Sequence, residues 1–431
     1  MQFPPTAKKL LLTSIVVALG YSTAAIAQDT ASAIRGKLLD ASGQPLTDAT
    51  VVVRDTRTGA TRTLQSNASG TFYATNLPVG GPYNVTVNGT KTVTVNSISL
   101  GDIYNLSIEM GESQIQEIIV LGGSNTFVDV AAGPSASFST FDMETSVAFD
   151  RDIKDVYSID PRMNLDGDSQ VNCVGKHPRF NSISLDGISQ NDRFGLNSNG
   201  YSTATGMPFP YEGIAQVSAE LAPFDVTYGG FTACNINAVT KSGSNEWTGT
   251  VFLERTGDQW RGDSLEVNGQ AQDYSTKGYT EDVKGFSIGG PILEDKLFFY
   301  GAYEESEQPR FLAAGYAGSS NGVERPWLSK ENHDRIEGIA KNLYNYDPGG
   351  LPADGTQTDE KYMLRVDWNI NEQHDATVIY NYYDGVQLRS SDGDDNEFEF
   401  ANHFYNKGAV SETTTVRLRS QWTDALSSEM F

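Results

Sequence analysis

The sequence predicts a mainly β protein of two to four domains. Glycine accounts for 42 of the 431 residues, above the usual share of about 7%, and tyrosine and phenylalanine number 20 each. Only 38% of the residues are hydrophobic, which excludes a bundle of membrane helices but not a membrane β-barrel, whose strands are apolar on one side. The formal net charge of −24 argues against nucleic-acid binding, because phosphate contacts need clustered Lys and Arg.

Residues 1–27 are predicted to be a secretory signal peptide. Lys8 and Lys9 precede a short apolar run at 10–19, and the small-residue sequence A-I-A follows at 25–27. A basic start, a short apolar centre and small residues before a cleavage site define such signals. The apolar run is too short to cross about 30 Å of hydrocarbon, so we expect an exported protein.

Residues 28–110 are predicted to form a small β-sandwich. Short alternating runs, such as 50–54 and 83–87, are separated by Gly, Pro and Asn turns at a spacing of about 8–12 residues. The order I-R-G-x-L-x-D-x-S-G-x-P-L-x-D-A-x-V from Ile34, followed by S-G-T-F from Ser69, resembles the carboxypeptidase regulatory-like domain. The resemblance implies a seven-stranded prealbumin-like sandwich without peptidase chemistry.

Residues 111–141 are predicted to be a linker with a β-prone segment, I-Q-E-I-I-V-L, at 115–121. An exposed segment of this kind suits β-augmentation, in which a peptide adds a strand to a partner's sheet edge. An ordinary buried strand is the alternative. The segment resembles the TonB box, through which outer-membrane receptors couple to an energising inner-membrane complex. The resemblance assigns this coupling to Glu117, Ile118, Ile119, Val120 and Leu121.

Residues 142–244 combine a short helix with strands expected at 178–187, 215–221 and 234–243. Ile153, Val156 and Tyr157 share one helical face before Pro161, which limits the helix. The sequences D-G-I-S-Q-N-D, A-P-F-D-V-T-Y-G-G-F and N-A-V-T-K-S-G resemble the mixed α/β plug domain of TonB-dependent receptors, with the closest likeness to the OmpA-related, Oar-like subgroup. These sequences begin at Asp186, Ala222 and Asn237.

Two sets of residues in the plug region are candidates for a role. Ligand contacts are expected within 191–211, at Phe194, Asn197, Asn199, Tyr201 and Phe209. A solvated loop, or a segment packed on the barrel wall, is the alternative. Cys173 and Cys234 are expected to form a disulfide because the exported chain meets an oxidising compartment, although free buried thiols are possible.

Residues 245–431 are predicted to hold the first strands of an outer-membrane β-barrel. Strands are expected at 247–255, 283–290, 296–304, 362–370, 376–383 and 413–422. Apolar residues such as Leu364 alternate with polar residues such as Arg365, as they do between lipid and a wet lumen. A soluble sandwich also alternates, but short turns at 291–295 and 371–373 against long connections at 306–360 and 384–412 favour a barrel.

The number of predicted strands indicates whether the 431 residues contain a whole barrel. Barrels of outer-membrane transporters that hold a plug have about 22 strands. Six strands and the start of a seventh cannot enclose a plug, and open edges in lipid leave backbone groups unpaired. We therefore expect the 431 residues to be part of a longer protein.

The sequence contains no convincing catalytic or metal-binding motif. The 4 histidines do not show zinc spacing. Residues 318–322 match G-x-S-x-G without the strand and helix that a nucleophile elbow needs. The acidic stretches 392–397 and 166–168 lack the spacing of an EF-hand loop. We expect no enzyme, no cofactor and no bound metal.

The resemblances together imply a TonB-dependent receptor in the outer membrane, with its N-terminal domain in the periplasm. The expected partners are a TonB-type energising complex, outer-membrane lipid and an extracellular ligand, which is a peptide, a glycan or a metal chelate. One alternative is an Oar-like surface protein for adhesion or outward protein export. A soluble exported carbohydrate-binding protein is a further alternative.

Overall fold

A computed structural model describes the part of the chain that carries the fold. The described residues are 32–101, 103–110, 135–146, 148, 151–165, 171–192, 200–203, 205–221, 229–260, 264–267, 270–273, 278–391, 396–423 and 426–431. The predicted signal peptide, TonB-box segment, Phe194, Asn197 and Asn199 lie outside them. Among the residues described, none of the helices combines the length and apolar character needed to cross a bilayer.

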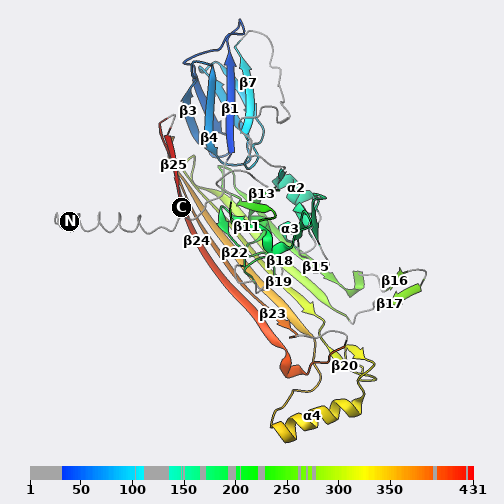
Figure 1. Ribbon diagram of the computed structural model, residues 1–431. Helices are drawn as coiled ribbons and strands as arrows, with labels where there is room; N and C mark the ends of the chain where they lie inside the picture. The colour runs from blue at the N-terminus through cyan, green and yellow to red at the C-terminus, as the bar shows by residue number, and fades with distance from the viewer. Residues whose placement is uncertain are drawn as a thin grey trace, which may run out of the picture.

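The N-terminal sandwich has seven strands in two sheets, as the sequence predicts (Figure 1). One sheet has the order β4-β1-β7 and consists of β1 (Ser32–Leu39), β4 (Thr71–Leu77) and β7 (Ile103–Glu109). The other has the order β3-β2-β5-β6 and consists of β2 (Thr50–Asp55), β3 (Thr61–Gln65), β5 (Tyr83–Val87) and β6 (Lys91–Val95). Alternate side chains such as Ile34, Val51 and Val85 fill the space between the sheets.

The sandwich closes with a parallel pair. β1 and β7 run in the same direction, from Ala33 opposite Ile103 to Leu39 opposite Glu109, whereas the other neighbours in both sheets are antiparallel. The chain therefore leaves the sandwich at the same end as the carboxyl end of β1.

The plug is built on a mixed five-stranded sheet with the order β12-β11-β14-β13-β8. Its strands are β8 (Ser135–Phe138), β11 (Ser182–Leu185), β12 (Ile188–Ser189), β13 (Ile214–Glu220) and β14 (Asn235–Thr240). Around it lie α2 (Thr140–Thr145), α3 (Ile153–Tyr157), the β9–β10 hairpin (Met163–Leu165 and Val171–Cys173) and the 3-10 turns η1 (Pro178–Phe180) and η2 (Tyr211–Gly213).

The plug core follows the predicted helical face. Ile153, Val156 and Tyr157 are fully buried in one cluster with the sheet. The sulfur atoms of Cys173 and Cys234 are bonded, with their Cα atoms 6.0 Å apart. The strand expected at 178–187 is wrong at its beginning, because Pro178 starts a 3-10 turn, where its fixed φ and missing N–H are tolerated.

The C-terminal half is a curved antiparallel sheet with the order β15-β18-β19-β22-β23-β24-β25 (Figure 1). Its strands are β15 (Thr248–Gly257), β18 (Thr280–Leu293), β19 (Leu297–Arg310), β22 (Gly355–Asn371), β23 (His374–Arg389), β24 (Tyr405–Thr423) and β25 (Leu426–Met430). All six predicted strands are present, followed by the seventh.

The strands are longer than predicted, so the long connections shrink to 311–354 and 390–404. Alternating hydrophobicity marks only the stretch that faces lipid, while the hydrogen-bonded ladder continues through polar residues. The two predicted faces of the strands are confirmed. Leu364 is 50% exposed on the outer face, whereas its neighbour Arg365 is 6% exposed on the inner face.

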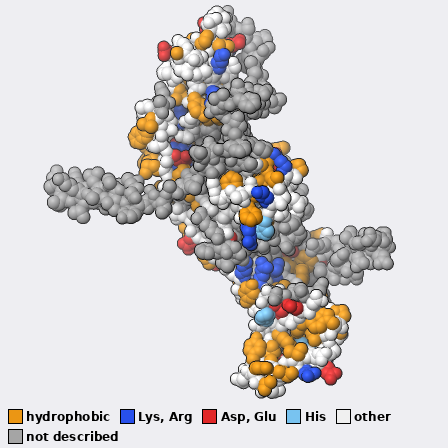
Figure 2. All heavy atoms as spheres, in the orientation of Figure 1, with side chains coloured by type: hydrophobic (Ala, Val, Ile, Leu, Met, Phe, Trp, Pro, Cys, Tyr) orange, Lys and Arg blue, Asp and Glu red, His pale blue; other side chains and the backbone are white. Residues whose placement is uncertain are grey.

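The connections at the end of the sheet farthest from the sandwich carry their own small elements. β20 (Ala314–Tyr316), β21 (Val323–Arg325) and α4 (Lys330–Tyr344) follow β19, and η4 (Ala401–His403) precedes β24. η3 (Asp258–Trp260), β16 (Ser264–Val267) and β17 (Gln270–Asp273) follow β15. Figure 2 shows hydrophobic side chains gathered at the end of the molecule that carries α4. Residues 318–322, which match G-x-S-x-G, connect β20 to β21 and are not followed by a helix, so they do not form a nucleophile elbow.

Candidate functional site

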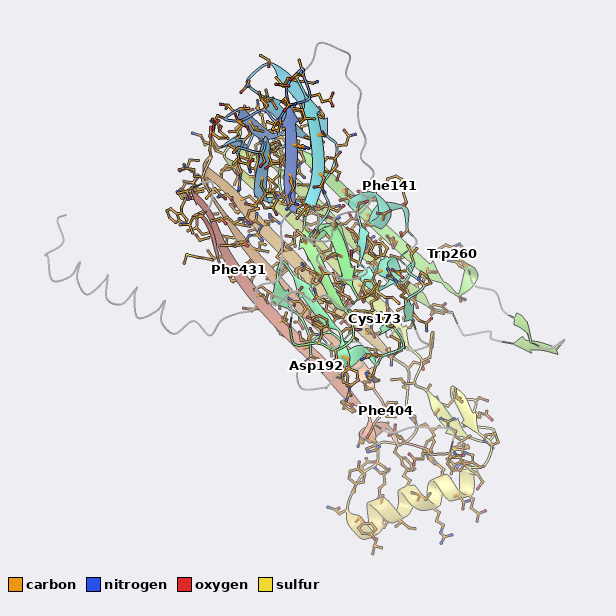
Figure 3. The ribbon with its side chains drawn as sticks, turned by 45° about the horizontal axis from the view of Figure 1, so that its top comes forward. Phe141, Cys173, Asp192, Trp260, Phe404 and Phe431 are labelled. Carbon is orange, nitrogen blue, oxygen red and sulfur yellow. A yellow bond between two sulfur atoms is a disulfide. The ribbon has the colours of Figure 1, made fainter. Side chains whose placement is uncertain are left out.

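The plug lies against the inner face of the barrel strands (Figure 3). Arg151 of the plug forms ion pairs with residues of these strands. Its Nε is 3.1 Å from Glu304 Oε2 on β19, and its Nη1 is 2.6 Å from Glu254 Oε1 on β15. Its Nη2 is 2.9 Å from Glu212 Oε1 in the plug. One plug guanidinium therefore joins two barrel strands.

The local backbone conformation and an aromatic ring of the barrel position the Arg151 side chain for these ion pairs. The residue has a φ of 48°, a left-handed conformation that non-glycine residues seldom adopt, directly before Asp152, the N-cap of α3. Its guanidinium lies 3.8 Å from the ring centroid of Phe252 on β15. Burial alone would lower the pKa of Arg151, but the carboxylates of Glu304, Glu212 and Glu254 outweigh burial and raise it.

Glu304 links the plug to a second barrel cation. Its Oε1 is 2.9 Å from Lys361 Nζ on β22, and its Oε2 also accepts a hydrogen bond from the backbone N–H of Tyr211 at 3.2 Å. Lys361 in turn is 3.4 Å from Asp359 Oδ1. The buried carboxylate is thus compensated by two cations and one backbone donor, as a buried charge requires.

A second contact fixes the end of plug strand β14. Arg365 of β22 donates from Nη1 to the carbonyl oxygen and to Oγ1 of Thr240, both at 2.9 Å. The same guanidinium is 3.8 Å from Asp186 Oδ1 and pairs with Asp367 at 2.8 Å. The A-V-T-K-S-G sequence at 238–243, in which β14 ends, therefore contacts the barrel wall at Thr240.

A third contact lies toward the α4 end. The backbone N–H of Thr205 donates to the hydroxyl oxygen of Tyr383 on β23 at 3.1 Å, and Thr205 Oγ1 donates to Asp359 Oδ2 at 3.2 Å. Polar groups from four barrel strands, β15, β19, β22 and β23, thus contact the plug.

Two of the predicted ligand contacts belong to the plug core in this conformation. Tyr201 is 0% exposed and Phe209 is 1% exposed. The Tyr201 hydroxyl donates to Asp152 Oδ1 at 2.8 Å, and burial, followed by the charge of Asp152, raises its pKa well above the usual value. Both rings pack in the core of the plug and not on the barrel wall, and ligand contact by this segment stays a prediction.

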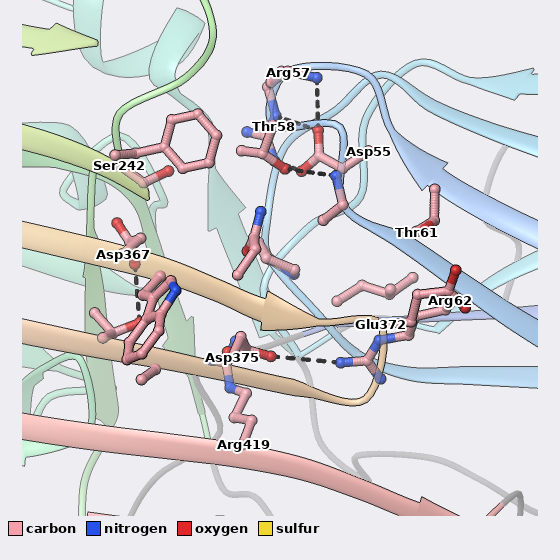
Figure 4. A pocket seen from close by; sticks show the side chains of 18 of the residues that line it. Asp55, Arg57, Thr58, Thr61, Arg62, Ser242, Asp367, Glu372, Asp375 and Arg419 are labelled. Atoms are coloured by element: carbon pink, nitrogen blue, oxygen red, sulfur yellow. Dashed lines mark hydrogen bonds and ion pairs between the residues drawn. The ribbon is translucent and has the colours of Figure 1, made fainter. Parts of the chain in front are cut away.

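The sandwich rests on the barrel turns that face it (Figure 4). Arg62 Nη2 is 3.8 Å from Asp375 Oδ1, and Thr63 Oγ1 donates to Glu372 Oε2 at 3.3 Å. The backbone N–H of Asn245 donates to the carbonyl oxygen of Arg57 at 2.8 Å. The cavity at this junction measures about 80 Å³, which is small for a ligand site.

Part of this site could be predicted from the sequence. Lys361 and Arg365 fall on the predicted polar face of their strand, so their inward direction could be predicted. Their partners could not, because Arg151 and Glu304 are 153 positions apart and nothing in either local pattern connects them.

Two family models match the chain. The carboxypeptidase regulatory-like domain matches residues 33–111, and the outer membrane beta barrel domain matches residues 239–316. The first covers the β1–β7 sandwich, and the second runs from the end of β14 through β19. Both matches agree with the fold predicted from the sequence.

A curated relative and two solved structures are similar to the chain. The TonB-dependent transporter Oar of Myxococcus xanthus is 26% identical over 398 residues, which are 86% of this chain and 35% of the relative. The outer membrane transporter YddB from Escherichia coli aligns with a TM-score of 0.46 and 10% identity over 67% of this chain and 37% of its own. The siderophore receptor PirA from Pseudomonas aeruginosa aligns with a TM-score of 0.38 and 12% identity, over 68% of this chain and 40% of its own.

The chain thus spans 35% of the length of the curated relative, and that relative is a transporter. With a carboxypeptidase regulatory-like sandwich, a plug and strands that match an outer-membrane barrel domain, the chain is an outer-membrane protein that is similar to the TonB-dependent transporter Oar.

Proposed function

We propose that the chain forms the coupling domain, the plug and part of the barrel of a TonB-dependent receptor that moves an extracellular ligand inward. The observation that carries the proposal is the chemistry of the contact between plug and barrel. Arg151, Glu304, Lys361 and Arg365 give this contact charged and polar groups. They lie beside a small buried apolar cluster, which consists of Tyr300, Ala302, Met363 and Ile379. Water can replace the partners of charged groups when a plug moves, and the recovered hydration offsets much of their lost attraction.

The order of elements suggests how tension would act. The segment 117–121 would pair with a TonB domain as an added strand, with the sandwich in the periplasm. The first described plug element after it is β8, an edge strand that pairs with β13 over four residue pairs only. Arg151 follows shortly after β8 in the chain. A pull from the periplasm would therefore separate β8 from β13 first. The force would then act on the ion pairs of Arg151 with the barrel.

A proline in the segment tests the coupling. Ile119→Pro removes a backbone donor from the added strand, so we expect loss of crosslinking to a TonB C-terminal domain and loss of ligand uptake in cells. Thr126→Pro, in the same linker but outside the segment, serves as the matched control and should retain both. Normal crosslinking and uptake in Ile119→Pro would contradict the proposal.

The direction of transport has its own test. An Oar-like protein that exports a protein or mediates adhesion would share the sandwich, the plug and the barrel strands. Protection of extracellular loops across a panel of peptides, glycans and metal chelates would identify the ligand. If uptake of that ligand stops when the proton gradient is dissipated, the result supports import. Accumulation of a secreted protein that depends on this chain would instead support export.

A further inference from the structure

The disulfide between Cys173 and Cys234 joins two parts of the plug that contribute unequally to its sheet. Of the five strands described in this sheet, residues 135–173 supply the edge strand β8, and residues 182–240 supply the other four in the order β12-β11-β14-β13. Cys173 is the last residue of β10 (Figure 3). Cys234 directly precedes β14, in the middle of the sheet. The bond therefore connects the end of the first part to the interior of the second.

The second part of the plug has contacts that do not depend on the first. β14 pairs with β13 over six residue pairs and with β11 over four. The carbonyl oxygen of Glu212 accepts a hydrogen bond from the hydroxyl of Tyr300 on β19 at 2.8 Å, and Arg365 on β22 donates to Thr240. Because none of these contacts passes through residues 135–173, they persist when that segment is withdrawn.

The first part is attached to the second by contacts that follow the chain in order. β8 pairs with β13 over four residue pairs at the edge of the sheet. Side-chain hydrogen bonds then join Thr140 to Ala215, Met143 to Tyr211 and Asp152 to Tyr201. A pull that enters before β8 breaks these contacts one after another and reaches Cys173 last.

At Cys173 the tension leaves the backbone. The 431 residues contain 2 cysteines, so this bond is the one disulfide that they can form among themselves. A cross-linked chain carries tension along the shorter of its two covalent routes, because the longer route stays slack. The tension therefore passes through the two sulfur atoms to Cys234 and on to β14. The loop between the cysteines, which are 61 positions apart, is bypassed.

We propose that the disulfide confines the opening of the plug under tension to residues 135–173 and keeps residues 174–233 out of the load. The inference rests on the proposed function for the source of the pull. The bypassed loop contains β11, β12 and β13. The path through the barrel then forms where Arg151 leaves Glu254 and Glu304. When the pull ends, β13 is still in place as the pairing partner of β8.

A single-molecule pulling experiment on the full chain in detergent micelles tests the proposal without TonB. One handle is attached through a peptide tag inserted after Thr126. The other is attached through a tag in the barrel turn at 371–373, where Glu372 contacts the sandwich. In the unchanged chain we expect residues 135–173 to be released first, after which the extension stops until barrel strands separate.

The double variant Cys173→Ala/Cys234→Ala should release about 200 Å more chain before the barrel strands separate. The reason is that 61 further positions, at about 3.3 Å each, enter the load path. Reduction of the unchanged chain after folding should give the same added length, which guards against a folding defect in the variant. Thr232→Ala, two residues before Cys234, is the matched control and should behave as the unchanged chain does.

Three results would overturn the proposal. They are equal released lengths in the unchanged chain and the double variant, release of the additional length by the unchanged chain, and departure of the whole plug in one step. Any of them, with loss of TonB crosslinking in Ile119→Pro, removes only the confinement by the disulfide. Normal crosslinking in Ile119→Pro contradicts the proposed coupling and leaves the pulling result standing.

Discussion

Arg151 has more negative neighbours than one guanidinium neutralises. It contacts Glu212, Glu254 and Glu304, and the excess is balanced by Lys361 on the barrel and by Lys241, which is 3.9 Å from Glu212 Oε2. The network is complete only when plug and barrel are together. Removing one member leaves a buried charge without its partner, which costs far more than the pair itself contributes.

Arg151→Met should therefore loosen the plug. The change keeps much of the side-chain volume but removes one of the two cations that compensate the buried Glu304. We therefore expect a loss of about 3–5 kcal/mol in the free energy of unfolding. Urea titration followed by protease sensitivity of the plug measures the loss. Arg162→Met is the control, because its partly exposed pair with Asp160 should contribute about 0–1 kcal/mol. Equal losses in the two variants would contradict the special role of Arg151.

The bond between Cys173 and Cys234 gives a second prediction for single residues. Unreduced protein, denatured and then alkylated, should carry no label on either cysteine. Cys234→Ser should lower the free energy of unfolding by about 2–5 kcal/mol, because the cross-link no longer restricts the unfolded chain. Two alkylated cysteines in unreduced protein would show that the thiols are free.

At the scale of single elements, the connection between β20 and β21 is held by one carboxylate. Glu324 accepts hydrogen bonds from the backbone N–H of Gly318 at 2.7 Å and of Ser320 at 2.9 Å. These donors favour the ionised carboxylate and hold the pKa of Glu324 below its ordinary value of 4.5. The stretch that formally matches a nucleophile elbow is thus a turn ordered by its own charge.

This turn should open in acid. Because the folded pKa of Glu324 is lowered, its contribution is complete above the unfolded pKa and is lost as the pH falls through the folded value. Amide hydrogen exchange of 314–325, corrected for the intrinsic rate, should lose protection as the pH falls from about 5 through the folded pKa of Glu324. Glu324→Gln should show little change over this range. A variant with the same pH dependence as the unchanged chain would exclude Glu324 as the cause.

Individual elements also show what the sequence could and could not predict. The alternation of Leu364 with Arg365 gave the strand and its two faces, because burial repeats every second residue. The same alternation fades outside the lipid-facing stretch, so the ends of β22 and β24 were missed. α4 was missed because it lies in a connection predicted only as long. The register that places Glu304 opposite Lys361 depends on pairing between strands, which no single segment encodes.

At the scale of the whole molecule, the sandwich is joined to the barrel turns by few contacts. Arg62 with Asp375, and Thr63 with Glu372, are side-chain contacts across this junction. Burial lowers the pKa of Arg62, while Asp375 favours its charged form. Polar contacts of this kind would resist separation of the sandwich from the barrel turns only weakly, although Val79 and Leu100 also pack against Val239 of the plug.

Reversal of one charge should weaken this junction, and reversal of both should restore it. Arg62→Asp places two acids opposite one another, so we expect weaker docking of the sandwich by about 1 kcal/mol or more. Asp375→Arg in the same chain should recover the contact with exchanged signs. Crosslinking yield between sandwich and barrel turns measures the effect. A double variant no better than Arg62→Asp would show that this pair does not orient the sandwich.

The parallel pairing of β1 with β7 has a mechanical consequence. The chain leaves the sandwich at the end of β7, so a pull from the segment at 117–121 acts along this strand. Seven residue pairs, from Ala33 with Ile103 to Leu39 with Glu109, then bear the load together in shear. If the force instead peeled the two strands apart from one end, the pairs would break one at a time. The sandwich would therefore separate from the barrel turns as a folded domain before any of its own strands is pulled out of its sheet.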